Sequence, residues 1–61
     1  MVKKCYLLTH STALIRVIAD LSIAFPCRIN TNPLGSKVFE LYIDCRPQDV
    51  SKIEGMLARF V

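Results

Sequence analysis

The sequence has no tryptophan, one histidine and only two glycines among its 61 residues. The two glycines, Gly35 and Gly55, are isolated from each other, which excludes a glycine-rich loop for binding phosphate groups. The three cysteines show no C-x-x-C spacing, which excludes the usual zinc and dithiol motifs. No apolar run approaches the roughly 18 residues of a membrane helix, because Arg16 and Asp20 interrupt the longest one. We therefore expect no cofactor, no bound metal and no membrane partner.

Catalytic constellations are also lacking in this sequence. A hydrolytic triad needs a base and an orienting acid beside the nucleophile, and the only histidine, His10, has no evident acid partner. The five carboxylates are spread over two predicted helices and one predicted strand, without a paired acidic motif. We expect that the protein is not an enzyme.

Apolar residues make up 52% of the chain, which argues against disorder. A chain of this size forms one domain and buries only about 60% of the surface that its unfolded form exposes. A lone monomer should therefore be marginally stable, which favours a partner chain. The net charge of +3 and the pI near 9.0 are a mild basic excess, and they support nucleic acid binding only weakly.

The odd number of cysteines favours a reducing compartment. Cys5, Cys27 and Cys45 cannot all pair within one chain, so a reducing cytosol is the simplest location. Free cysteine behaves as a small hydrophobic residue. We expect all three thiols to lie on the inward phase of their strands, buried and inert.

Periodicity divides the chain into five elements. Residues 37–45 alternate with a period of two, which predicts a strand with Phe39 and Leu41 on one face and Glu40 on the other. A loop with Pro33 and Gly35 joins it to a shorter strand, which predicts a hairpin. The predicted order is strand, helix, strand, strand, helix, over residues 3–9, 12–25, 27–32, 37–45 and 47–61.

Both predicted helices have an apolar stripe at steps of three and four residues, which is typical of a helix that packs on a core. Hydroxyl side chains at residues 9–12 predict the N-cap of the first helix, and Pro47 predicts the start of the second. Ile23 is the exception, because it falls on the polar side of the first helix. The predicted stripes are Leu14, Val17, Ile18, Leu21 and Phe25, and Val50, Ile53, Leu57 and Phe60 with Met56 and Val61 at the margin.

These elements predict a two-layer α+β domain with both helices on one face of the sheet. The crossover through the first helix predicts that the first strand lies parallel to a neighbour, and the hairpin makes the other two strands antiparallel. The predicted sheet order is second, third, first strand. Cys5, Leu7 and Thr9 are expected to face the helices. The open face is then predicted to carry Lys4, Tyr6, Leu8, Arg28, Asn30, Val38, Glu40, Tyr42 and Asp44.

The unpaired edge of the first strand and the open sheet face are the main functional clues, because proteins usually cover, blunt or use such an edge. We expect an interaction or regulatory module that forms a homodimer, or binds another protein, through one of these surfaces. The predicted interface residues are Lys4, Tyr6, Leu8 and Tyr42.

The alternative hypothesis is a nucleic-acid-associated protein that uses the open face. Single-strand binders stack bases on sheet aromatics beside basic side chains. Glu40 and Asp44 share the predicted face and would repel phosphate. The residues that would form this surface are Lys4, Tyr6, Arg28 and Tyr42.

Three segments resemble the regulatory ACT-type domains, which bind amino acids or other small effectors, usually across a dimer or oligomer interface. Ser11–Leu21 is similar to the first helix of that family, and Ile29–Pro33 and Phe39–Asp44 are similar to its second and third strands. The resemblance implies a ferredoxin-like fold, here without a fourth strand because nothing follows the second helix. It also implies an effector site in the loop formed by Thr9, His10, Ser11 and Thr12, where Ser11-Thr12 stands in place of the family's usual Pro-Gly turn.

Two further resemblances imply other functions. The element order and the segment Leu21–Pro26 resemble the DinI-type DNA-damage-inducible inhibitors, which modulate a recombinase filament, but the acidic C-terminal extension of that family is absent. The segment Leu8–Leu14 resembles the start of the first helix in histidine-containing phosphocarrier proteins. This resemblance implies that His10 accepts a phosphoryl group at a helix N-terminus. The family's Ala-Arg-Pro after the histidine is Ser-Thr-Ala here, at residues 11–13.

Overall fold

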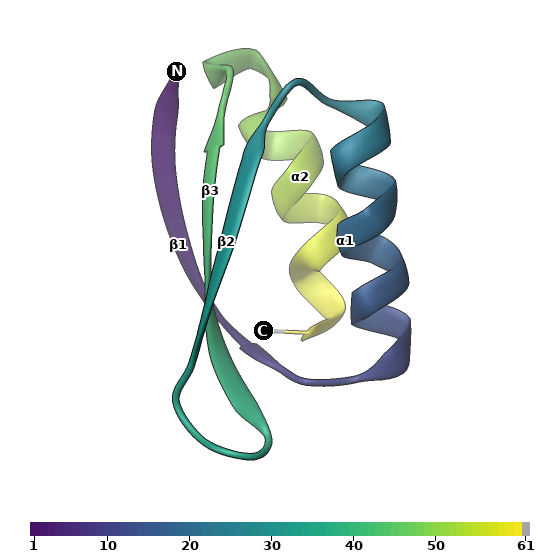
Figure 1. Ribbon diagram of the computed structural model, residues 1–61. Helices are drawn as coiled ribbons and strands as arrows, with labels where there is room; N and C mark the ends of the chain where they lie inside the picture. Colours follow the sequence, from purple (N-terminus) through teal and green to yellow (C-terminus); the bar gives the residue numbers. More distant parts are fainter. Residues whose placement is uncertain (61) are drawn as a thin grey trace.

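The five main elements follow one another in the predicted order, and the α+β fold class is confirmed (Figure 1). The computed structural model describes residues 1–60. Single turns of 3₁₀ helix, Pro47–Asp49 and Ala58–Phe60, extend the second helix at its two ends. The elements are β1 (Val2–Thr9), α1 (Thr12–Ala24), β2 (Arg28–Pro33), β3 (Val38–Cys45) and α2 (Val50–Leu57).

β3 is the central strand of a three-stranded sheet with the predicted order, β1-β3-β2. It is antiparallel to both neighbours, so that Tyr6 of β1 and Thr31 of β2 lie opposite Leu41. The expectation that the first strand lies parallel to a neighbour was wrong. The hairpin places β3 between β1 and β2, and it therefore separates the two strands that run in the same direction.

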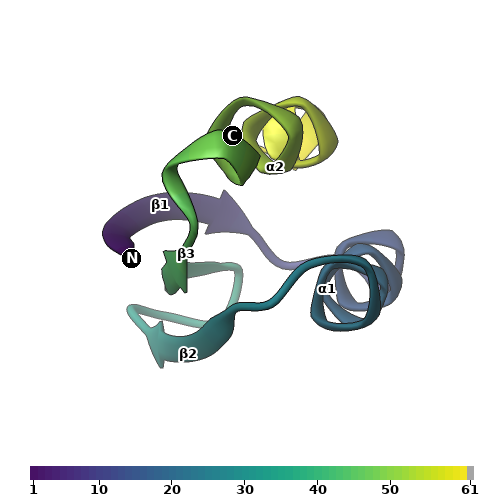
Figure 2. The same cartoon turned by 90° about the horizontal axis from the view of Figure 1, so that it is seen from above.

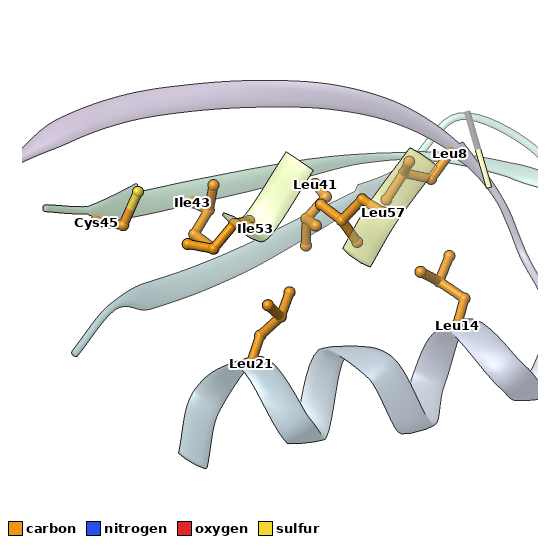
Figure 3. Packing of buried hydrophobic residues seen from close by; sticks show 8 residues of the cluster. All are labelled: Leu8, Leu14, Leu21, Leu41, Ile43, Cys45, Ile53 and Leu57. Atoms are coloured by element: carbon orange, nitrogen blue, oxygen red, sulfur yellow. The ribbon is translucent and has the colours of Figure 1, made fainter. Parts of the chain in front are cut away.

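Both helices pack on one face of the sheet and leave the opposite face bare, with α2 on the β1 side and α1 on the β2 side (Figure 2). Between the layers, apolar side chains from the sheet and both helices point toward one another (Figure 3). Full burial of a leucine or isoleucine side chain stabilises a fold by about 1.5–3 kcal/mol. The fold therefore depends on one small cluster, which consists of Leu8, Leu14, Leu21, Leu41, Ile43, Cys45, Ile53 and Leu57.

The side-chain phase predicted for β1 was wrong. Leu8 is only 1% exposed and lies opposite Phe39 on the helix-covered face, whereas Leu7 is 58% exposed on the open face. Tyr6 and Lys4 share the phase of Leu8, so their side chains also lie on the helix-covered face and not, as was predicted, on the open face. The run Tyr6-Leu7-Leu8 is apolar throughout and is compatible with either phase, so packing beneath α2 decides between them. The open face of β1 consists of Lys3, Cys5, Leu7 and Thr9.

Of the three cysteines predicted to be buried, only Cys45 is buried. Cys5 is exposed because it shares the phase of Leu7. Cys27 is half-buried just before β2, and its thiol donates to the carbonyl oxygen of Leu21 at 3.8 Å. Burial raises the pKa of the Cys27 thiol, which keeps this group protonated and poorly nucleophilic.

The helices begin where the sequence predicts. The Oγ of Ser11 accepts a hydrogen bond from the Leu14 N–H at 3.1 Å and caps α1. Ile23 is 86% exposed on the polar side of α1, as its position in the sequence indicated. The predicted stripes of both helices pack on the core, and Val61 alone lies outside the described residues.

Candidate interaction site

β1 forms one border of the sheet and has no strand on its outer side among residues 1–60. It is eight residues long and contains neither proline nor glycine. It pairs with β3 along its whole length, from Val2 opposite Cys45 to Thr9 opposite Val38. Backbone groups that point away from β3 can therefore pair with another strand.

The charges of β1 are confined to one end of the strand. Lys3 and Lys4 are its only charged residues, and the part from Cys5 to Thr9 carries no charge. Lysine on an edge strand is a common protection against pairing with other chains. Here that protection covers only the N-terminal part of the edge.

Tyr6 links β1 to α2. Its hydroxyl donates to Oε2 of Glu54 at 2.9 Å. Burial, together with the hydrogen bond to Glu54, raises the pKa of Tyr6 well above its ordinary value, so the hydroxyl stays protonated. The contact also places Glu54 on the flank of α2 nearest the β1 edge. Ser51 and Ala58 lie three residues before and four after Glu54, so they share that flank, and all three are exposed.

Glu40 organises the middle of the open sheet face. Its Oε1 accepts hydrogen bonds from the Tyr42 hydroxyl and the Asn32 side-chain amide, both at 3.0 Å. The thiol of Cys5 lies 4.0 Å from Oε2. The hydrogen bond to Glu40, helped by burial, raises the pKa of Tyr42 to about 12. This carboxylate is therefore already surrounded by donors from all three strands.

The predicted nucleic-acid surface is not assembled as expected. Of its four residues, only Arg28 and Tyr42 lie on the open face, because Lys4 and Tyr6 belong to the other phase of β1. Lys3 takes a place there instead, and Lys3 and Arg28 flank Asp44 across the sheet. A row of alternating charge and a single tyrosine form a weaker platform for bases and phosphates than the predicted set.

The predicted effector loop is divided among different parts of the molecule. Thr9 ends β1 on the open face, Ser11 caps α1, and Thr12 begins α1. Of these four residues, only His10 borders a groove of about 290 Å³ between α1 and the β2–β3 hairpin, whereas Thr12 lines a separate pocket beside Arg59. The His10 N–H donates to the carbonyl oxygen of Lys37 at 2.7 Å, and its ring lies edge-on to that of Phe39, with centroids 6.1 Å apart.

The other walls of the groove are mainly apolar, and they were missed in the sequence. Ile15 and Ile18 of α1 face Pro33 and Phe39 of the hairpin. These residues are distant along the chain, so no local pattern unites them. Ile15 lies off the predicted apolar stripe of the helix and is exposed. Its position outside the stripe was the one feature of the sequence that could have indicated an apolar surface here.

Within residues 1–60, no three histidine, cysteine, aspartate or glutamate side chains are grouped so that they could hold a metal ion. Neither helix of that part has the length and apolar content needed to cross a membrane. Comparison with protein-family models, curated proteins and solved structures gave no match. The ACT-type, DinI-type and phosphocarrier resemblances therefore stay predictions.

Proposed function

We propose that this protein is a non-enzymatic interaction module that forms a homodimer by pairing the β1 edges of two copies in the cytosol. The eight-residue β1 edge, unpaired within residues 1–60 and charged only at one end, supports the proposal. Antiparallel pairing about a two-fold axis would join the two three-stranded sheets into one.

The size of the molecule also supports a dimer. Within residues 1–60, the core contains eight fully buried apolar side chains, and a chain of this length is marginally stable alone. Each backbone hydrogen bond formed across the edge contributes about 0.5–1.5 kcal/mol. Several such bonds, with partial burial of Leu7 beside them, stabilise the folded chain by mass action.

The proposed interface differs from the one predicted from the sequence. Leu8 lies in the protein's own core, and Tyr42 lies on the central strand, so neither is placed to contact a strand beyond the β1 edge. Lys4 and Tyr6 stay in the interface through their position on β1. Lys3, Cys5 and Leu7 join them from the open face.

The first test is the solution mass over a concentration series, by sedimentation or light scattering, with and without a short single-stranded oligonucleotide. We expect a reversible dimer whose mass does not respond to the oligonucleotide. A chain that stays monomeric until the oligonucleotide is added would overturn the proposal and support the nucleic-acid hypothesis instead.

A matched pair of lysine variants separates the two edges of the sheet. Leu7→Lys adds a charge to the uncharged part of β1, and Asn30→Lys adds the same charge to β2. A cross-strand pair is worth about 0.2–1 kcal/mol and occurs twice in a two-fold dimer, so Leu7→Lys should raise the dimer Kd by about 2- to 30-fold. Asn30→Lys should leave it unchanged. Equal effects at both sites would contradict pairing through β1.

The groove beside His10 favours a second role, the binding of a small effector. Its volume of about 290 Å³ and mainly apolar walls suit a compact ligand with an apolar body. We expect that apolar amino acids, added one at a time, shift the backbone amide resonances of the groove, and that His10→Ala reduces these shifts. No shift with any of them at millimolar concentration would count against this role.

A further inference from the structure

We infer that the two β1 strands of the dimer pair with Cys5 of one copy directly opposite Cys5 of the other. This inference rests on the proposed edge-paired dimer and specifies its register. The register determines which side chains of the second copy lie beside the acidic residues near the edge, so different registers differ in electrostatic energy.

Two-fold symmetry restricts the possible registers. Residues that lie directly opposite each other in an antiparallel pair point to the same side of the sheet. In β1 the even-numbered residues face the helices and the odd-numbered ones face away. One residue of β1 must therefore lie directly opposite its own copy across the two-fold axis. The residues near the middle of the strand that can take this position are Lys4, Cys5, Tyr6 and Leu7.

The other three registers do not place Lys4 opposite the Tyr6–Glu54 pair of the second copy. Centring on Lys4 places Lys4 opposite its own copy, which is repulsive. Centring on Tyr6 places the partner's Lys4 opposite Leu8 and its Lys3 opposite Thr9, which pair with Phe39 and Val38. Centring on Leu7 moves both lysines beyond the C-terminal end of the strand.

Centring on Cys5 gives both lysines an acidic neighbour on the other copy. The Lys4 of the second copy then lies opposite Tyr6, whose hydroxyl holds Glu54 at 2.9 Å on the helix side. The Lys3 of the second copy lies opposite Leu7, whose neighbour across the sheet is Glu40 on the open side. Because the axis repeats every contact, the register supplies two attractions on each face.

The flank of α2 beside β1 is compatible with this arrangement. α2 lies on the β1 side of the helix layer (Figure 2). Pairing of two β1 edges would therefore bring the α2 helices of the two copies alongside each other. Within residues 1–60, the neighbours of Glu54 along this flank are Ser51 and Ala58, and Gly55 lies next to it. A Cβ added at Gly55 would have no atom within 4 Å, so local packing does not require glycine at this position. The small side chains allow the close approach that pairing of the strands beneath demands.

Disulfide mapping tests the register with the protein's own thiols. Directly opposite residues have Cα atoms about 4.5–5.5 Å apart, which is within the range of a disulfide. On mild oxidation with diamide, each Cys5 thiol gives up one hydrogen, diamide takes up both, and an S–S bond forms between the copies. We expect a covalent dimer linked through Cys5, and Cys5→Ser should remain uncrosslinked with Cys27 and Cys45 in place.

A Leu7→Cys variant that retains Cys5 distinguishes the registers, with the linked residues identified by fragmentation mass spectrometry. A link from Cys5 to Cys5 supports the inference. A link between positions 5 and 7, a link between the two positions 7, or a dimer by mass that does not crosslink overturns the register but leaves the edge dimer standing. A monomer at all concentrations of the unmodified protein overturns both.

A charge exchange provides an independent readout. Lys4→Glu should raise the dimer Kd by about 2- to 30-fold, because two exposed ion pairs are lost. Lys4→Glu combined with Glu54→Lys should recover most of this loss, whereas Lys4→Glu combined with Asp20→Lys should not. Equal recovery by both second changes would overturn the register, since it would show a response to net charge alone.

Discussion

The two edge strands of the sheet differ in how well they resist pairing with another chain. β2 has six residues, ends in Pro33, and exposes every side chain except that of Ile29. β1 has eight residues, no proline, and a C-terminal part without charge. Proline and polar side chains discourage the addition of a strand. The sheet therefore has two edges by topology, and β1 is the one better suited to pairing.

The two edges are also anchored differently to the rest of the fold. β1 is fixed from the helix side, where Tyr6 reaches Glu54 and Leu8 enters the core. β2 is fixed by half-buried Ile29 on the helix side and by Asn32, which reaches Glu40 on the open face. Both side-chain hydrogen bonds are exposed, but Leu8 is fully buried and Tyr6 is half-buried, so changes on β1 should cost more stability.

The largest difference is expected between Leu8→Ala and Thr31→Ala. Leu8 is fully buried, and truncation of such a leucine typically costs about 2–5 kcal/mol. Thr31 is exposed on β2, and its truncation should change the free energy of unfolding by less than about 0.5 kcal/mol. Urea denaturation measures both values. A cost for Leu8→Ala as small as that for Thr31→Ala would show that the phase of β1 is the reverse of the one described.

A smaller difference should separate the two side-chain anchors. Tyr6→Phe keeps the ring but removes the hydrogen bond to Glu54, and we expect a loss of about 1 kcal/mol. Both hydrogen bonds are exposed, but the Asn32 side chain is itself exposed whereas Tyr6 is half-buried, so Asn32→Ala should cost less than about 0.5 kcal/mol. Thermal unfolding of both variants, at one protein concentration, provides the comparison. A larger shift for Asn32→Ala would contradict the view that β1 is the better anchored edge.

The smallest effect concerns alkaline pH. The folded state raises the pKa of Tyr42 from 10.0 to about 12, so it favours the protonated phenol. That stabilisation is fully present below pH 10 and is lost as the pH rises through about 12. Glu40→Gln removes the acceptor charge, and it should move the Tyr42 transition in an ultraviolet titration back toward 10.0. The Tyr6 transition, which burial and Glu54 raise, should not move with it.

Much of the fold could be predicted because local patterns in the sequence were unambiguous. In β3, polar Glu40 and Asp44 alternate with Leu41 and Ile43, so only one phase buries apolar side chains. Ser11 and Pro26 bracket α1 by capping and by breaking the helix. Sheet order and helix placement follow from these elements and from short connections.

The candidate site was predicted less well because it depends on contacts between distant segments. Leu8 and Leu7 are chemically identical, so only α2, more than forty residues later, distinguishes them. The same packing brings Tyr6 to Glu54 and exposes Cys5. The groove beside His10 likewise needs Phe39 from the hairpin.

Local sequence patterns were thus sufficient for the five elements, the phase of β3 and the order of the sheet, because side-chain period, caps and chain connectivity act over a few residues. The tertiary structure alone decided the phase of β1, and with it which side chains border the unpaired edge. The reason is that a strand with apolar residues on both faces has no local preference. Which of its two faces is buried depends on the free energy of packing against a helix elsewhere in the chain.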